Sequence, residues 1–310
     1  MTPRKKLSPD EHTLPLLDEP GGIAPDEIKV KSPTYPVWTE NKAKLIQRYL
    51  QYFVFITKHG TYIDGFAGPQ ERAFHDMWTA KLVLESQPRW LRHFFLCDAD
   101  PDQVGSLESL RKGLAPRKRG EPRRNIEIFS GDFNEKVDQV LSSGVITEKE
   151  AAFALLDQRT FECQWQTVAK LAAHKKQGNK IELLYFLPIK WLHRSISGLK
   201  DPEQLDRWWG HDSWRDLAKA NTVSICRAFC ERVRSVFDYR SVMPWAIHES
   251  ETGGAVMYYL IHATDHPEAP KLMSRAYRKA NMPLEPQEQL LLLLATEDGV
   301  DQGLFDSPLR

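Results

Sequence analysis

The chain has 310 residues, of which 41% are hydrophobic and 27% are charged, an ordinary globular composition that suits one large domain or two small ones. Lysine and arginine together number 42, as do aspartate and glutamate, so the formal net charge is zero. This balance disfavours a protein that binds nucleic acid by electrostatics alone, although it allows a local basic patch. No apolar run is long enough to span a bilayer, and none follows the basic N-terminus as in a secretory signal, so we expect a cytoplasmic protein without membrane contact.

The first 35 residues are predicted to be a flexible, proline-rich tail. Prolines recur through residues 1–35, a Gly-Gly pair lies at 21–22, and aromatic residues are nearly absent. Such a segment buries too little apolar surface to offset the entropy that it would lose on ordering. We therefore place the folded domain at residues 36–310.

Strand-like and helical segments alternate along the start of this domain. A helical pattern over 38–59 precedes the strand-like "TYID", and further strands are predicted at 93–100, 126–134, 151–160 and 180–188, with helices between them. The strands are continuous apolar runs, as expected where both faces of a sheet are covered. The alternation predicts an α/β fold with a Rossmann-like, doubly wound, mostly parallel sheet.

The C-terminal part breaks the alternation. Residues 189–221 are rich in tryptophan and are predicted to be a helical insertion after the fifth strand. After a helix at 222–237, the segments "RSVMPWAIHE" and "AVMYYLIHAT" are predicted to pair as antiparallel strands around a Gly-Gly turn. Two more helices are predicted after this pair, the last over residues 286–295.

Each of the first four strands ends in an aspartate: Asp64, Asp98, Asp132 and Asp157. Ligands of open parallel sheets bind at the carboxyl ends of the strands, so these carboxylates are expected along one rim. For any single aspartate, capping of the following helix is an equally good interpretation. Four acids in consecutive units favour a ligand site.

The motifs at these strand ends favour S-adenosylmethionine as the ligand. The first loop, D-G-F-A-G-P, matches neither the G-x-G-x-x-G dinucleotide motif nor a P-loop. A methyltransferase needs a glycine-containing first loop, an acid that accepts both ribose hydroxyl hydrogens, and a polar residue beside the adenine. These parts are supplied, in order, by Asp64, Gly65, Phe66, Ala67 and Gly68; by Asp98 or Asp100; and by Asp132 beside Phe133. Asp157 would then orient or deprotonate the methyl acceptor.

The segments "YIDGFAGP", "FLCDADP", "SGDFN" and "YYLIHATDHPEAPKLM" resemble the three-Cys-motif partner protein family, TcmP, over about residues 38–281. The resemblance implies a class I methyltransferase-like fold, S-adenosylmethionine as cofactor, and a three-Cys-motif, radical-SAM-like protein as partner. The chain departs from the family pattern at Gln70, where a glycine is usual, and after Asp157, where Gln158 replaces the usual proline. These departures leave open a degenerate, non-catalytic partner subunit.

A third hypothesis is an enzyme that acts on nucleic acid, either a base methylase or a nuclease that uses the acids with magnesium. Basic and aromatic side chains suited to phosphates and stacked bases occur together in the insertion; the candidates are Lys190, Arg194, Trp208 and Trp209. The alternative is that the tryptophans fill the core, which is less favoured for Trp208 and Trp209 because adjacent helical residues cannot both point fully inward. The basic stretch 112–124 is expected to be a solvated face.

The four cysteines predict neither a disulfide framework nor a metal site. Cys226 and Cys230 share a helix face, but no second pair of ligands with suitable spacing accompanies them. They are expected to be small buried hydrophobic residues.

Overall fold

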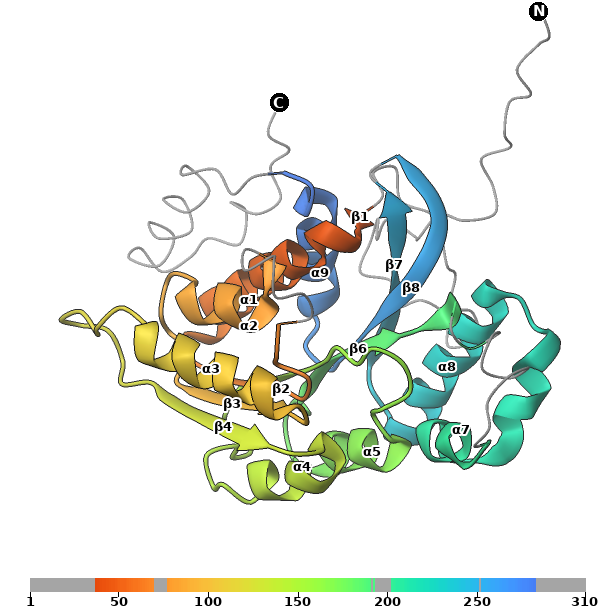
Figure 1. Cartoon of the computed structure of the whole chain (residues 1–310), viewed down its shortest axis with the longest axis horizontal. Coiled ribbons are helices and arrows are strands. Elements are labelled where there is room, and N and C mark those ends of the chain that lie inside the picture. Colours follow the sequence, from red (N-terminus) through yellow and green to blue (C-terminus); the bar gives the residue numbers. More distant parts are fainter. Residues whose placement is uncertain (1–36, 70–76, 191, 193–201, 251, 283–310) are drawn as a thin grey trace, which may run out of the picture.

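A mixed sheet forms the centre of the computed structural model, which describes residues 37–69, 77–190, 192, 202–250 and 252–282 (Figure 1). Its strand order is β1-β7-β8-β6-β5-β2-β3-β4. The strands are β1 (Val37–Trp38), β2 (Thr61–Asp64), β3 (His93–Asp98), β4 (Asn125–Ser130), β5 (Ala152–Leu156), β6 (Glu182–Leu187), β7 (Ser241–Ser250) and β8 (Gly253–Thr264).

The sheet is parallel from β4 to β6 and antiparallel only around β8. Strand β2 pairs in parallel with both β3 and β5, so the first long strand of the domain lies centrally. Strand β8 runs antiparallel between β6 and β7, and its first two residues, Gly253 and Gly254, have φ values of 101° and 82°. The predicted mostly parallel sheet with antiparallel C-terminal strands is confirmed.

Helices cover both faces of the sheet, as doubly wound folds require (Figure 1). One face carries the 3-10 helix Thr39–Asn41 and the helices α1 (Lys42–Thr57), α2 (Thr79–Glu85), α3 (Pro101–Gly113) and α9 (Ala269–Lys279). The other face carries α4 (Phe133–Leu141), α5 (Trp165–Ala173), α7 (Pro202–Trp209), the 3-10 helix Asp212–Lys219, and α8 (Thr222–Phe237).

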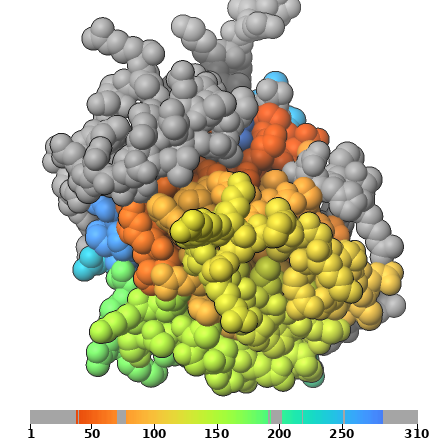
Figure 2. All heavy atoms as spheres, turned by 90° about the vertical axis from the view of Figure 1, so that its left-hand side faces the viewer, coloured from red at the N-terminus to blue at the C-terminus, as the bar shows by residue number. Residues whose placement is uncertain are grey.

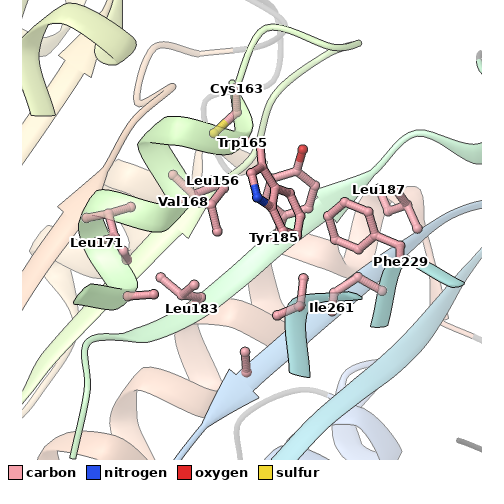
Figure 3. Packing of buried hydrophobic residues seen from close by; sticks show 14 of the residues in the cluster. Leu156, Cys163, Trp165, Val168, Leu171, Leu183, Tyr185, Leu187, Phe229 and Ile261 are labelled. Carbon is pink, nitrogen blue, oxygen red and sulfur yellow. The ribbon is translucent and has the colours of Figure 1, made fainter. Parts of the chain in front are cut away.

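Successive residues of each strand feed the two apolar cores. Tyr62 packs into the core beneath α1 and α9, whereas the next residue, Ile63, belongs to the core beneath α4 and α5. In the second core, the Tyr185 ring stacks on Phe229 of α8 with 4.9 Å between ring centroids (Figure 3). Because both faces are buried, the strands read as continuous apolar runs rather than alternating ones.

The edge strand β4 is reached through an exposed connection. In Figure 2 the residues between α3 and β4 (yellow) cover the middle of the face, with those of α4 (yellow-green) below them. Residues 115–120 are all exposed. The prediction that the basic stretch 112–124 is mostly a solvated face is confirmed.

Two predicted boundaries differ from the structure. The helix expected over 38–59 begins at Lys42, after a short strand and a 3-10 turn. The strand expected over 151–160 ends at Leu156, because the following residues turn away to form a loop that Gln158 stabilises from within. The expected tail at 1–35 and the expected helix at 286–295 lie outside the described residues. Among the described helices, none has the length and apolarity that crossing a membrane requires.

Candidate functional site at the carboxyl ends of the strands

A cavity of about 470 Å³ opens at the carboxyl ends of β2, β3, β4 and β5. This volume lies within the roughly 300–1,000 Å³ that is usual for small-molecule sites. The cavity brings together three of the four predicted strand-end acids, Asp98, Asp132 and Asp157. The other predicted residues that line it are Gly65, Phe66, Gly68, Asp100 and Phe133.

Asp98 is held in place by the loop that follows β2. Its Oδ2 accepts a hydrogen bond from the Gly68 amide at 2.9 Å, and its Oδ1 accepts one from the Asp100 amide at 3.0 Å. An ionised carboxylate has about four acceptor positions, so each oxygen keeps capacity for one more donor. Asp98 is therefore oriented by the backbone and still able to accept two hydroxyl hydrogens.

The two glycines of the first loop serve close packing within the protein. A Cβ on Gly68 would lie 2.5 Å from Oδ2 of Asp98, and one on Gly65 would lie 2.6 Å from the Phe133 ring. The glycines let the loop approach the side chains that form the cavity wall.

Asp100 and Asp132 cap the helices that follow their strands. Asp100 Oδ1 accepts from the Asp102 amide at 2.9 Å at the start of α3, and Asp132 Oδ1 accepts from the Asn134 amide at 2.9 Å at the start of α4. Both side chains also line the cavity, so capping and ligand contact are compatible. The adjacent Phe133 is 2% exposed and packs in the core while its ring forms part of the cavity wall.

Asp64 lies behind the main cavity rather than in its wall. It is 1% exposed, and its carboxylate accepts from the Tyr62 hydroxyl at 2.8 Å and from the Phe66 amide at 3.2 Å. Burial raises the pKa of Asp64 to about 7, although these two hydrogen bonds oppose the rise. With Ala67, Asp64 lines a smaller adjoining hollow of about 30 Å³.

Asp157 is paired with a lysine that sequence reasoning missed. The Lys42 Nζ atom lies 2.9 Å from Oδ1 and 2.7 Å from Oδ2 of Asp157, and the two residues are 6% and 4% exposed. Burial, the largest single effect, lowers the pKa of Lys42, but the attraction and hydrogen bond of Asp157 together with the attraction of Tyr258 and Asp64 outweigh it, and the pKa is raised. Lys42 therefore stays charged. The pairing suits Asp157 to accept a hydrogen bond more than to remove a proton.

The loop after Asp157 is stabilised by a buried glutamine. The Gln158 side chain is fully buried; its Nε2 donates to the Phe186 carbonyl at 2.9 Å and its Oε1 accepts from the Cys163 amide at 2.7 Å. The loop therefore keeps a defined shape and places Arg159 and Phe161 in the cavity wall.

The residues predicted to contact nucleic acid are dispersed or buried. Trp208 and Trp209 are 1% and 4% exposed, and their indole nitrogens donate to the Tyr185 and Ser213 hydroxyls at 2.7 and 3.0 Å. The expectation that one of these adjacent tryptophans faces outward is wrong, because both indoles pack around Phe229 of α8. Lys190 is half-buried and its Nζ lies 3.6 Å from Glu249, and Arg194 lies outside the described residues.

Metal and thiol chemistry find no support in the described part of the chain. Within it, no group of three or more His, Cys, Asp or Glu side chains is arranged to hold a metal ion. All four cysteines are buried, and burial raises the pKa of Cys97, the thiol in β3 next to Asp98, to about 12.

The strand order identifies the fold. Read from β4, the order β4-β3-β2-β5-β6-β8-β7, with β8 reversed, is that of class I methyltransferases, and the chain has this methyltransferase-like fold. No protein-family model and no curated protein matches the sequence.

Three solved structures resemble the chain at low similarity. A DUF519 family-model protein from Legionella pneumophila shares 8% identity and a TM-score of 0.41, over 78% of this chain and 92% of that one. Trm1 from Pyrococcus horikoshii, in complex with S-adenosyl-L-methionine, shares 10% identity and a TM-score of 0.37, over 79% and 61%. A DUF574 family protein from Streptomyces avermitilis shares 12% identity and a TM-score of 0.39, over 73% and 83%. At such scores the fold assignment depends on the strand order itself.

Proposed function

We propose that the chain binds S-adenosylmethionine in the 470 Å³ cavity and methylates an acceptor held beside Asp157. The observation that carries the proposal is the position of Asp98, fixed at the end of β3 by the Gly68 and Asp100 amides with acceptor capacity to spare. Such a carboxylate suits a ribose diol. When bound, the cofactor supplies an activated methyl group.

The other residues of the cavity have matching roles in this proposal. Asp132 and Phe133 offer a polar and an apolar contact for the adenine, and Gly65 and Phe66 lie where the methionine part would pass. Asp157, held by Lys42, would accept a hydrogen bond from the acceptor and orient it. Most of the acceleration would come from positioning, because the methyl group is already activated.

Calorimetric titration with S-adenosylhomocysteine tests the cofactor assignment. We expect binding to the wild-type chain and at least roughly tenfold weaker binding to Asp98→Asn, because a charged acceptor facing the ribose is replaced in part by a donor. Asp102→Asn is the matched control, since Asp102 is exposed on α3 outside the cavity wall. Absence of binding to the wild type at high micromolar concentration would refute the proposal.

A non-catalytic, cofactor-binding subunit is the second candidate. It is favoured by the ion pair, because Lys42 engages both oxygens of Asp157, the acid that directly follows β5. In line with the TcmP resemblance, the partner would be a three-Cys-motif protein. Binding of S-adenosylhomocysteine without methyl transfer, together with co-purification of such a partner, would support this candidate over the enzyme.

A further inference from the structure

The wall of the cavity on the other side from Asp98 is rich in hydrogen-bond donors. It is formed by the loop after β5, the start of α5, and α7, which packs beside α5 (Figure 1). We call it the acceptor-side wall and define it by Arg159, Gln164, Gln204 and Arg207, all of which line the cavity. Each of these side chains presents N–H groups.

Three of these side chains make no polar contact with the described residues. In the part of the chain that the structure describes, the side chains of Arg159, Gln164 and Gln204 make no hydrogen bond and no ion pair. Arg207 pairs with Glu203 at 3.4 Å, but the two side chains are 48% and 78% exposed, and such pairs contribute little. Donors converging on a cavity without internal partners are available to a ligand.

The charges of the cavity are segregated. Asp98, Asp100 and Asp132 lie on the β3 and β4 side. On the other side, Asp157 is neutralised by Lys42, which leaves Glu162 as the remaining acid against Arg159 and Arg207. The Glu162 carboxylate also accepts a hydrogen bond from the Thr160 amide at 2.6 Å. Because Arg207 pairs with Glu203 in the same way, the acceptor-side wall has no net charge, but it presents the guanidinium of Arg159 opposite a wall that is net negative.

We propose that the acceptor-side wall binds an oxyanion, a phosphate or carboxylate group carried by the methyl acceptor, with Arg159 as the residue that selects it. A guanidinium presents paired N–H groups that match such an oxyanion, and the two glutamine amides add neutral donors. The acids of the opposite wall repel the same group, so the oxyanion has one favourable orientation in the cavity. The claim that the bound group belongs to a methyl acceptor rests on the proposed function, whereas the claim that this wall binds an oxyanion does not.

Binding measurements with three probes test the proposal: inorganic pyrophosphate, malonate, and a fluorescein-labelled twelve-nucleotide single-stranded oligonucleotide. Each probe is measured at constant ionic strength, with and without S-adenosylhomocysteine. We expect at least one of these probes to bind the full chain and Arg159→Gln to weaken it roughly ten- to a hundredfold. Gln204→Ala should weaken it less, and Arg227→Gln, on the exposed side of α8, should leave it unchanged. Thermal melting of each variant verifies that the fold is retained.

The outcomes separate the two proposals. Equal affinity of the wild type and Arg159→Gln, or no binding of any probe to the wild type, overturns the oxyanion site whatever the cofactor result. Probe binding that depends on Arg159 in a chain that fails to bind S-adenosylhomocysteine keeps the oxyanion site and removes the methyltransferase assignment. A preference for the oligonucleotide identifies a polymeric acceptor, and a preference for pyrophosphate or malonate identifies a small one.

Discussion

The ammonium group of Lys42 lies within 2.9 Å of both carboxylate oxygens of Asp157, although the residues are 115 positions apart in the chain. The pair joins the first turn of α1 to the loop after β5, and its Asp157 stands in the wall of the candidate site. It fixes Asp157 in place and cancels the charge of this acid on the acceptor side.

Removing one partner of this pair should strongly destabilise the protein. Lys42→Met leaves a buried carboxylate without its counter-ion, and we expect the free energy of unfolding to fall by about 3–5 kcal/mol. The double variant Lys42→Met, Asp157→Asn should be less destabilised than Lys42→Met alone, because no uncompensated charge remains. Urea denaturation of the wild type, Lys42→Met, Asp157→Asn and the double variant measures the coupling energy between the two residues.

A surface pair provides the control for that cycle. Lys170 and Asp138 are only 2.6 Å apart but are 31% and 64% exposed, so Lys170→Met should cost no more than about 1 kcal/mol. Equal losses in Lys42→Met and Lys170→Met would show that the buried pair has no special importance for stability.

The raised pKa of Asp64 predicts that the free energy of unfolding depends on pH. Its pKa is raised to about 7 in the folded protein, so the folded state binds a proton between pH 4 and 7 that the unfolded state releases. The contribution of Asp64 to stability is thus complete below about pH 4 and is lost as pH rises through 7, a total on the order of 4 kcal/mol. In Asp64→Asn this dependence is absent, so the difference in unfolding free energy between variant and wild type should shift in favour of the variant from pH 5 to pH 8. If the unfolding free energies of wild type and Asp64→Asn changed in parallel with pH, the raised pKa of Asp64 would be contradicted.

The sequence predicted those parts of the site that local patterns encode. Asp98 and Asp132 each stand between an apolar run and a helix, and the parallel topology brings such positions to one edge. Lys42 has no such signal, because it opens an amphipathic helix like any surface lysine and meets Asp157 only after the sheet has formed. Helix geometry alone predicts that Trp208 and Trp209 cannot both point inward. The contact of both rings with Phe229 of α8 cannot be read from their own segment.

Gly68 should be intolerant of any side chain. In Gly68→Ala the new Cβ would lie 2.5 Å from Oδ2 of Asp98 and 2.5 Å from the Gln103 Cβ, so the loop must shift. We expect a loss of about 1–3 kcal/mol in unfolding free energy from overpacking, together with weaker binding of S-adenosylhomocysteine because Asp98 loses its orienting amide. Calorimetry and urea denaturation measure the two effects.

Gly105 offers the matched control for this substitution. It lies on α3, and a Cβ there would meet no atom within 4 Å. Gly105→Ala should stabilise the helix by up to about 1 kcal/mol and leave ligand binding unchanged. If both alanine variants bound S-adenosylhomocysteine like the wild type, Gly68 would not control the position of Asp98.

Gln158 should prove essential to the loop that carries Arg159. In Gln158→Ala the Phe186 carbonyl and the Cys163 amide both lose their partner in the protein interior, at a cost of about 1–3 kcal/mol for each buried group. The loop should also become more mobile, so hydrogen exchange at the Cys163 amide should accelerate while the strands remain protected. Gln166→Ala, at an exposed position on α5, is the control and should change neither stability nor exchange. Unchanged protection of the Cys163 amide in Gln158→Ala would mean that the loop keeps its shape without this side chain, and that the glutamine does not replace the missing proline.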